Sequence, residues 1–204
     1  MATGTTALQL MKVAEADFPS RFGHFRIYGF EGHFPTGVEE AVVLKLGDIS
    51  GPPPLVRIHS QCLTGDVFHS LRCDCRAQLE LALYKIGEDG RGLLIYEHQE
   101  GRGIGLMNKL RAYELQDDGA DTVEANVRLG FKPDHRRYEL PGAVLNWFGI
   151  HEVRLLSNNP EKIQALERSG VRVVERVPCI VAPSATTTDY LRTKQEKMGH
   201  LLDL

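Results

Sequence analysis

The alternation of apolar and polar residues predicts short β-strands in the first quarter of the chain. Residues 25–28 and 41–46 are short alternating runs set among glycines and prolines, a pattern typical of antiparallel strands. The prolines at 52–54 exclude a helix, and the apolar run at 55–59 after them predicts one more strand. We therefore expect residues 1–50 to form an antiparallel sheet, followed by a strand that leads into the first cysteine.

The spacing of apolar positions changes to that of a helix at residue 68. It predicts a helix over 68–86, closed by the glycines between 87 and 92, and then a buried strand over 92–96. A glycine-rich turn at 101–105 precedes a predicted helix over 106–117, which Gly119 ends. Beyond it we expect a helix over 142–148, a strand over 151–156, a helix over 160–168 and a strand over 171–175.

The order of these elements predicts the fold class. Strands and helices alternate from residue 92 onward, which favours an α/β (α+β) fold with at least one parallel strand pair. We expect a mixed sheet packed with helices in a single compact domain over 1–204, with 183–204 as a C-terminal tail. A chain of 204 residues buries enough surface to fold without disulfides.

Composition and net charge limit the classes of partner that the protein could bind. The net charge of −3 gives no basic field for nucleic acid, and no apolar run approaches the roughly 20 residues that cross a bilayer. The first residues show no secretory pattern, so we expect a cytoplasmic protein with reduced thiols. Three of the four cysteines fall within 62–75, which points to a metal, whereas Cys179 stands alone and is expected to be an inert buried thiol.

The three clustered cysteines, Cys62, Cys73 and Cys75, form a C-x10-C-x-C pattern. Zinc binds thiolates well, and three protein ligands leave a fourth position for water, as in catalytic zinc sites. Such a site supplies hydroxide near neutral pH. His59 or His69, both close in sequence, could instead complete a closed structural site, and this alternative stays open.

The residues around the cysteines are more specific than the cysteines themselves. Segments 57–66 (RIHSQCLTGD) and 70–75 (SLRCDC) resemble the zinc-binding region of GTP cyclohydrolase II, the first committed enzyme of riboflavin biosynthesis. The resemblance continues in order through nearly the whole chain, at 99–106, 111–113, 121–126, 129–131, 158–160 and 197–200.

The resemblance implies a reaction and its cofactors. The family hydrolyses GTP to 2,5-diamino-6-ribosylamino-4(3H)-pyrimidinone 5′-phosphate, formate and pyrophosphate. It implies one catalytic Zn²⁺ per subunit on Cys62, Cys73 and Cys75, Mg²⁺ with the triphosphate, and a homodimer without nucleic-acid or membrane partners.

Three residues match the family's catalytic positions. Tyr113 matches the tyrosine that assists ring opening, and members with another residue there retain the formyl group. Asp134 and Arg136 match a D-x-R pair described as proton acceptor and nucleophile toward the α-phosphate. Because guanidinium keeps its proton to above roughly pH 12, we favour phosphate clamping and charge neutralisation for Arg136. Arg137 lies one position away, so a shifted register is an alternative.

The resemblance also implies contacts to GTP. Glu100 would accept from the guanine N1–H and 2-amino group, and glycine N–H groups of the 101–105 turn would approach an anion. Taken alone, Lys162 would be a surface lysine. The implied GTP ligands are Arg57, Ile58, His59, Ser60, Gln61, Gln78, Glu100, Gly101, Arg102, Thr122, Ser157 and Lys162.

Two departures from the family keep alternatives open. Gln61 stands where the family usually has Glu, and Ser157 stands where Thr is commoner. The first change leaves room for a paralogue that retains the formyl group or acts on another nucleotide. An alternative of another class is a non-catalytic zinc module binding nucleotide or RNA. A redox role is disfavoured because the pattern lacks C-x-x-C.

Overall fold

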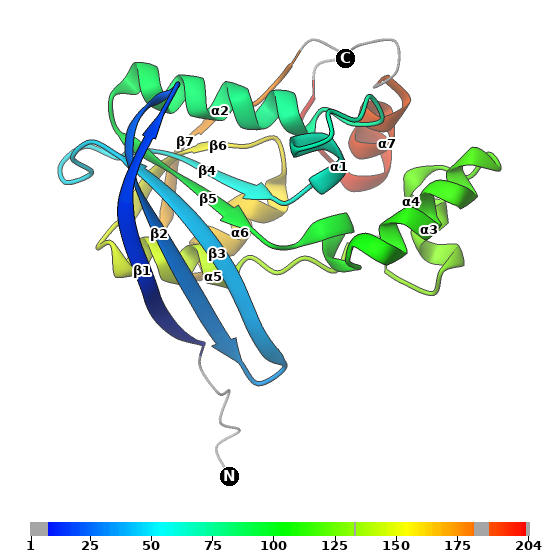
Figure 1. The fold of residues 1–204 in the computed structure, drawn as a ribbon, viewed down its shortest axis with the longest axis horizontal. Coiled ribbons are helices and arrows are strands. Elements are labelled where there is room, and N and C mark those ends of the chain that lie inside the picture. Colours follow the sequence, from blue (N-terminus) through cyan, green and yellow to red (C-terminus); the bar gives the residue numbers. More distant parts are fainter. Residues whose placement is uncertain (1–7, 133, 182–187, 203–204) are drawn as a thin grey trace.

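A mixed β-sheet organises the computed structural model, which describes residues 8–132, 134–181 and 188–202 (Figure 1). Within these residues the sheet has seven strands in the order β1-β2-β3-β5-β4-β6-β7. The strands are β1 Gln9–Ser20, β2 Gly23–Phe34, β3 Gly37–Leu46, β4 Leu55–Ser60, β5 Gly92–Glu97, β6 Glu152–Leu156 and β7 Arg172–Val177.

Two halves of the sheet differ in strand direction. β1, β2 and β3 form an antiparallel meander, and β3 pairs antiparallel with β5. β4 pairs parallel with β5 and β6, and β6 pairs parallel with β7. The expected mixed sheet with parallel pairs is therefore confirmed. β4 and β5 are buried along almost their whole length, as strands covered on both faces must be.

The helices cover both faces of the sheet. α2 packs on β4 and β5, where Ala82 and Ile86 meet Phe25, Leu55 and Leu94. α5 and α6 build a second core on the opposite face (Figure 1). The helical elements are α1 Leu63–Asp66, α2 Cys75–Asp89, the 3₁₀ turn η1 Glu100–Gly103, α3 Leu106–Asp117, α4 Thr122–Arg128, α5 Glu139–Trp147, α6 Pro160–Arg168 and α7 Thr188–Met198.

The helix expected over 68–86 is wrong at its start. Residues 68–74 form a loop, and α2 begins only at Cys75. His69 lies in the left-handed region with φ 56°, which a helix does not admit, and Ser70 N donates to Thr64 O at 2.9 Å instead. The loop is folded back onto α1, which places Cys73 beside Cys62. α2 then runs through Gly87 and ends at Gly90, whose φ is 70°.

The other predicted element boundaries differ less from those in the structure. α5 begins at Glu139 rather than at residue 142, and α4, which the apolar pattern did not predict, is held by a capping box on Asp121. In the tail, the charged segment forms α7, while 183–187 and 203–204 lie outside the described residues. No helix of the described residues is both long and apolar enough for a membrane span.

Candidate active site

Three cysteines from separate elements meet at the carboxyl end of β4. Cys62 follows the strand, Cys73 lies in the loop of residues 68–74 and Cys75 opens α2. Their Sγ atoms all lie within 4.8 Å of one another, and those of Cys62 and Cys73 are 3.7 Å apart. Tetrahedral zinc with Zn–S bonds of about 2.3 Å requires sulfur atoms about 3.8 Å apart, so the thiols fit this ion.

Neither histidine near the cysteines belongs to this group of described residues. His59 is buried with Nε2 3.2 Å from Asp66 Oδ1, and His69 is exposed. The site therefore offers three protein ligands, the number typical of catalytic zinc.

Gly65 leaves the space that the sulfur atoms occupy. A Cβ at this position would lie 2.8 Å from Cys73 Sγ and 3.0 Å from Cys62 Sγ. Hydrogen bonds from the other two thiols lower the pKa of Cys62, and the bond to Cys62 raises the pKa of Cys73 to about 11. One thiolate thus forms readily, and a bound cation would have to displace the remaining protons.

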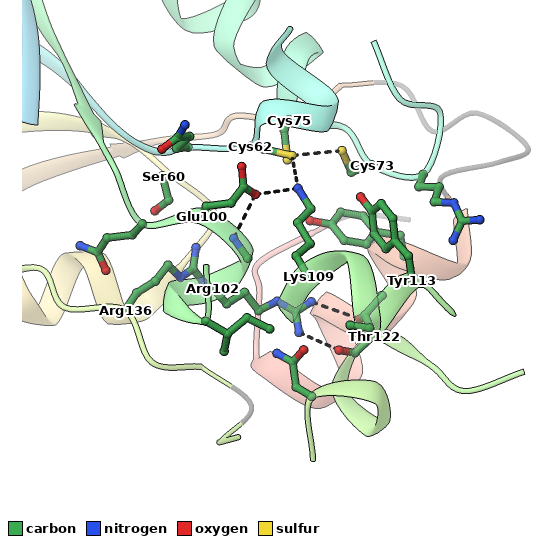
Figure 2. A pocket seen from close by; sticks show the side chains of 18 of the residues that line it. Ser60, Cys62, Cys73, Cys75, Glu100, Arg102, Lys109, Tyr113, Thr122 and Arg136 are labelled. Atoms are coloured by element: carbon green, nitrogen blue, oxygen red, sulfur yellow. Dashed lines mark hydrogen bonds and ion pairs between the residues drawn. The ribbon is translucent and has the colours of Figure 1, made fainter. Parts of the chain in front are cut away.

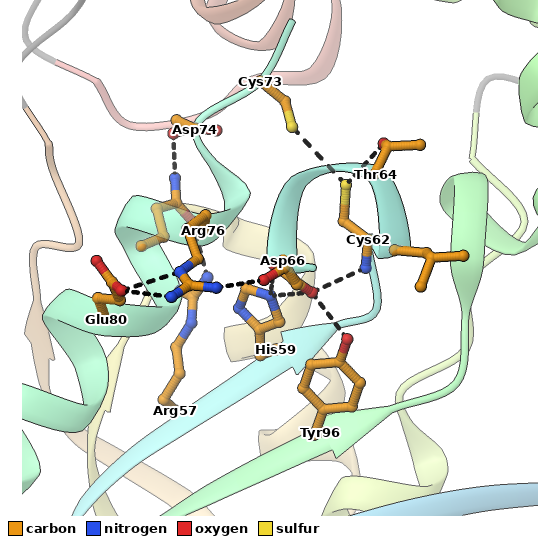
Figure 3. Close-up of polar contacts among 12 residues, drawn as sticks. Arg57, His59, Cys62, Thr64, Asp66, Cys73, Asp74, Arg76, Glu80 and Tyr96 are labelled. Atoms are coloured by element: carbon orange, nitrogen blue, oxygen red, sulfur yellow. Dashed lines mark hydrogen bonds and ion pairs between the residues drawn. The ribbon is translucent and has the colours of Figure 1, made fainter. Parts of the chain in front are cut away.

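A buried carboxylate fixes the chain around Cys62 (Figure 3). Asp66 accepts from Cys62 N at 3.0 Å, from Tyr96 Oη at 2.8 Å and contacts His59 Nε2. Its backbone oxygen accepts from Arg76 at 2.6 Å. Because these donors come from β4, β5 and α2, they set the position of the first cysteine against the sheet.

Lys109, which the sequence reasoning missed, lies beside the thiols on α3. Its Nζ is 3.2 Å from Cys62 Sγ and 2.7 Å from Glu100 Oε1 (Figure 2). Burial opposes the charge, but Cys62 and Glu100 raise the pKa of Lys109 above its ordinary value. The sequence did contain an indication that Lys109 belongs to the site: it stands four residues before Tyr113 and therefore lies on the same face of the helix.

Glu100 is held by three donors of the protein. Its carboxylate accepts from Leu63 N at 2.6 Å, Gly101 N at 3.0 Å and Lys109 Nζ. A carboxylate has about four acceptor positions, so little capacity remains for a guanine. Arg102 has φ 61°, and its guanidinium donates to Thr122 Oγ1 at 3.1 Å.

Glu100, Arg102, Lys109 and the three cysteines line one cavity, and Tyr113 faces this cavity from α3 (Figure 2). Its hydroxyl is 3.0 Å from Thr64 Oγ1, and the Arg72 guanidinium lies 4.8 Å from the ring centre. Burial raises the pKa of Tyr113, which keeps the hydroxyl protonated at neutral pH. A protonated hydroxyl group therefore lies in the wall of the cavity that the three thiols also line.

Asp134 and Arg136 form a half-buried ion pair. Arg136 Nε donates to Asp134 Oδ1 at 3.0 Å, and Arg136 N donates to the same oxygen at 2.9 Å. Although burial opposes it, Tyr138 and Asp134 raise the pKa of Arg136. Arg137 instead donates to Thr36 Oγ1 at 2.8 Å and lines another surface hollow. The structure thus favours the D-x-R register in which Arg136 reaches the site.

A second cavity adjoins the first and is rich in cations. Arg57 is buried and donates to Leu156 O at 3.0 Å and to Gln78 Oε1 at 2.8 Å. Lys162 is only 4% exposed and donates to Ile58 O at 2.8 Å. The surface-lysine alternative is therefore wrong. Burial, Arg57 and Arg136 lower the pKa of Lys162.

Most of the implied GTP ligands line these two cavities. Ile58 does not, because its side chain is buried in the core between the sheet and α5. The first cavity is lined by Ser60, Gln61, Glu100, Gly101, Arg102 and Thr122, together with the three cysteines, Tyr113 and Arg136. The second is lined by Arg57, His59, Ser60, Gln78, Arg102, Ser157 and Lys162, again with Arg136.

The fold and the site define a class: a mixed α/β protein in which three thiols that could hold a metal ion line one cavity, and an adjoining cavity is rich in cations and suited to phosphate groups. The chain belongs to the GTP cyclohydrolase II family, whose model matches residues 11–178.

Curated relatives match along almost the whole chain. A GTP cyclohydrolase-2 of Proteus mirabilis (strain HI4320) is 55% identical over 96% of this chain and 98% of its own. Those of Escherichia coli O9:H4 (strain HS) and Haemophilus influenzae (strain PittGG) are 54% and 52% identical, over 96% and 95% of this chain and 100% and 90% of theirs. A solved two-domain 3,4-dihydroxy-2-butanone 4-phosphate synthase from A. baumannii shares 15% identity at TM-score 0.47, covering 88% of this chain and 42% of that chain.

Proposed function

We propose that this chain is a zinc-dependent enzyme that hydrolyses GTP to 2,5-diamino-6-ribosylamino-4(3H)-pyrimidinone 5′-phosphate, formate and pyrophosphate, the first committed step of riboflavin biosynthesis. One observation carries the proposal: the three thiols at zinc spacing line a cavity that adjoins a second, cation-rich one, in a chain of the GTP cyclohydrolase II family.

The cysteines would hold one Zn²⁺, which supplies Lewis acidity and an activated water when bound. Around it, Tyr113 presents a protonated hydroxyl to the reacting ring. Arg136 stays charged in its ion pair with Asp134 and is suited to neutralise the α-phosphate as charge develops there. Mg²⁺ would enter on the triphosphate itself, since the second cavity is lined mainly by cations and amides.

We also propose that residues 1–204 form one catalytic domain and that two chains form a homodimer. β1 is the outermost strand of the sheet, with Met11 and Val13 about half exposed. An exposed edge strand that carries apolar side chains can pair with another chain. Sedimentation velocity of the full chain tests the dimer, and a monomer at all concentrations would contradict it.

The test of function is product analysis. Zinc-loaded protein is incubated with GTP and Mg²⁺, products are identified by mass, and formate and pyrophosphate are assayed. We expect both to be released. Cys73→Ser should abolish turnover and lower bound zinc, whereas Cys179→Ser, which alters a thiol buried against α2, should change neither.

Each other outcome selects an alternative. Pyrophosphate without formate would identify a paralogue that retains the formyl group, which is the alternative that Gln61 leaves open. Unchanged GTP with intact zinc, and turnover of a different nucleotide, would identify another substrate. Binding of GTP without turnover of any nucleotide would identify a non-catalytic module.

A further inference from the structure

The second cavity is completed by the C-terminal segment of the chain. Tyr190 and Lys194 on α7, and His200 just beyond it, line the cavity together with Arg57 and Lys162. Neither Lys194 nor His200 has a role in the function proposed above. Both are brought there by α7, which starts at Thr188, far along the chain from the loop of residues 68–74.

Lys194 connects this helix to the metal centre and the cavity. Its Nζ lies 3.0 Å from Asp74 Oδ1, and Asp74 stands between the cysteines of the C-x-C pair. Asp74 also accepts from Gln78, which in turn accepts from Arg57. Lys194 is 9% exposed, and its Nζ lies 4.3 Å from the centre of the Tyr190 ring. It is therefore a buried cation in the wall of the cavity rather than a surface lysine.

The cavity contains more positive charge than its own residues compensate. Five Arg and Lys side chains line it, and the ion pairs of the described residues account for two of them, Lys194 with Asp74 and Arg136 with Asp134. Arg57 and Lys162 donate to backbone carbonyl groups and an amide, with no carboxylate among their described partners. Burying such cations is unfavourable unless an anion enters with them.

Polar atoms without partners gather in the same place. Six buried side-chain N or O atoms of the described residues lack a hydrogen-bond partner, and four belong to residues that line this cavity. Burial and the nearby positive charges of Lys194 and Arg136 lower the pKa of His200 to about 3, so its imidazole ring is neutral at neutral pH. The four atoms are Arg57 Nε, His59 Nδ1, Ser60 Oγ and His200 Nε2.

We propose that Lys194 and His200 are substrate-binding residues that hold the terminal phosphates of the nucleotide in the second cavity. This rests on the proposed function for the identity of the nucleotide. Arg136 lines both cavities, whereas Lys194 and His200 line only the one without Tyr113 and Glu100. The α-phosphate beside Arg136 therefore places the β- and γ-phosphates toward the C-terminal segment.

α7 also provides a matched control. Lys197 lies three residues after Lys194 and pairs with Asp121 and Glu124 at the start of α4, outside the cavity. Both lysines attach α7 to the rest of the protein, but only Lys194 faces the cavity. If Lys194 only attaches α7 to the rest of the protein, replacing either lysine should have the same effect on phosphate binding.

The experiment measures binding of inorganic tripolyphosphate by calorimetry, and KM for GTP, with the full zinc-loaded chain. We expect Lys194→Met to weaken tripolyphosphate binding and raise KM about tenfold or more, the value of one charge-assisted hydrogen bond. Lys197→Met should leave both unchanged. Inhibition by GMP, which lacks the terminal phosphates, should be the same in both variants.

Conservative variants distinguish the loss of a phosphate contact from a general effect of the substitution on folding. Lys194→Arg keeps the charge and should retain most of the binding, and His200→Gln should weaken tripolyphosphate binding less than His200→Leu. Equal effects of Lys194→Met and Lys197→Met, or a loss of GMP binding as large as that of tripolyphosphate, would overturn the proposal. Because tripolyphosphate binding needs no turnover, wild-type protein that binds it but releases no formate would contradict only the proposed function.

Discussion

Lys109 Nζ lies 3.2 Å from Cys62 Sγ and, on its other side, 2.7 Å from Glu100 Oε1. One half-buried ammonium group thus joins a thiol of the cysteine cluster to a carboxylate that lines the first cavity. The same cation that stabilises the thiolate also fixes the carboxylate, so the metal centre and the cavity are positioned as a unit.

Replacing Lys109 with Met should therefore weaken metal binding. The loss of a residue that contacts a metal ligand typically costs about 10–100-fold in affinity. Competition with a zinc chelator measures this directly. Arg111→Met is the control, because Arg111 lies on the same helix, is exposed and donates only to Asn108 among the contacts of the described residues. Equal zinc affinity of wild type and Lys109→Met would contradict the prediction.

Gly65→Ala should disrupt the metal centre without a change of charge. The added Cβ would stand 2.8 Å from Cys73 Sγ, closer than carbon and sulfur approach. We expect zinc content to fall well below one ion per chain, with a lower melting temperature. Gly29→Ala is the matched control, since its Cβ would meet only Val13 at 4.0 Å. A full complement of zinc in Gly65→Ala would show that the loop adjusts around the methyl group.

Tyr113→Phe should separate the steps of the reaction. It removes the hydroxyl that lies 3.0 Å from Thr64 Oγ1 and leaves the ring beneath Arg72. General acid–base assistance is worth about 10²–10⁴-fold in rate, so formate release should fall by that range while pyrophosphate release continues. Mass spectrometry would then find the formylated intermediate. Thr64→Val removes the partner of the Tyr113 hydroxyl but leaves that hydroxyl in place, so it should reduce formate release much less. An equal loss of formate release in both variants would exclude Tyr113 as the assisting group.

Arg136→Met should lower kcat by about 10²–10³-fold, as expected for one charge-stabilising group in the transition state. Arg136→Lys keeps the positive charge and should recover part of this loss. The raised pKa of Arg136 keeps it a cation, so no covalent nucleotidyl-arginine should accumulate in quenched reactions. Detection of such an adduct by mass would support the nucleophile role instead.

Glu97 should make stability depend on pH. It is fully buried, and burial is the main reason that its pKa is raised from 4.5 to about 8. Between these values the folded chain keeps a proton that the unfolded chain has lost. Its contribution to stability is complete below pH 4.5 and is lost as the pH rises through about 8.

Glu97→Gln has the shape of the protonated form and cannot ionise. Its free energy of unfolding should therefore fall less than that of wild type as the pH rises through this window, by up to roughly 1.4 kcal/mol per pH unit. Urea unfolding of both zinc-saturated proteins, at a series of pH values, checks this. Parallel curves for the two proteins would show that Glu97 ionises normally in the fold.

The periodicity of the chain determined most of the elements. β5, α3 and α6 follow the apolar pattern closely, because each buries one continuous face against a neighbour. The start of α2 did not follow it. Residues 68–74 have helical spacing, yet the contacts that fold this loop onto α1 exclude a helix there.

The sequence by itself also predicted the three cysteines as metal ligands, because C-x10-C-x-C and its neighbours lie within one short stretch, residues 57–75. Only the tertiary structure decided which other side chains share the site. The apolar pattern did not single out Lys109, Lys194 or His200, although Lys109 shares a helix face with Tyr113 and His200 falls in the family-like segment 197–200. A lysine on an amphipathic helix looks the same in the sequence whether it faces water or a cavity. Lys109 lies beside the thiols, and Lys194 and His200 lie in the wall of the second cavity, because α3 and α7 pack against segments far away in the chain. The local sequence pattern does not encode such contacts.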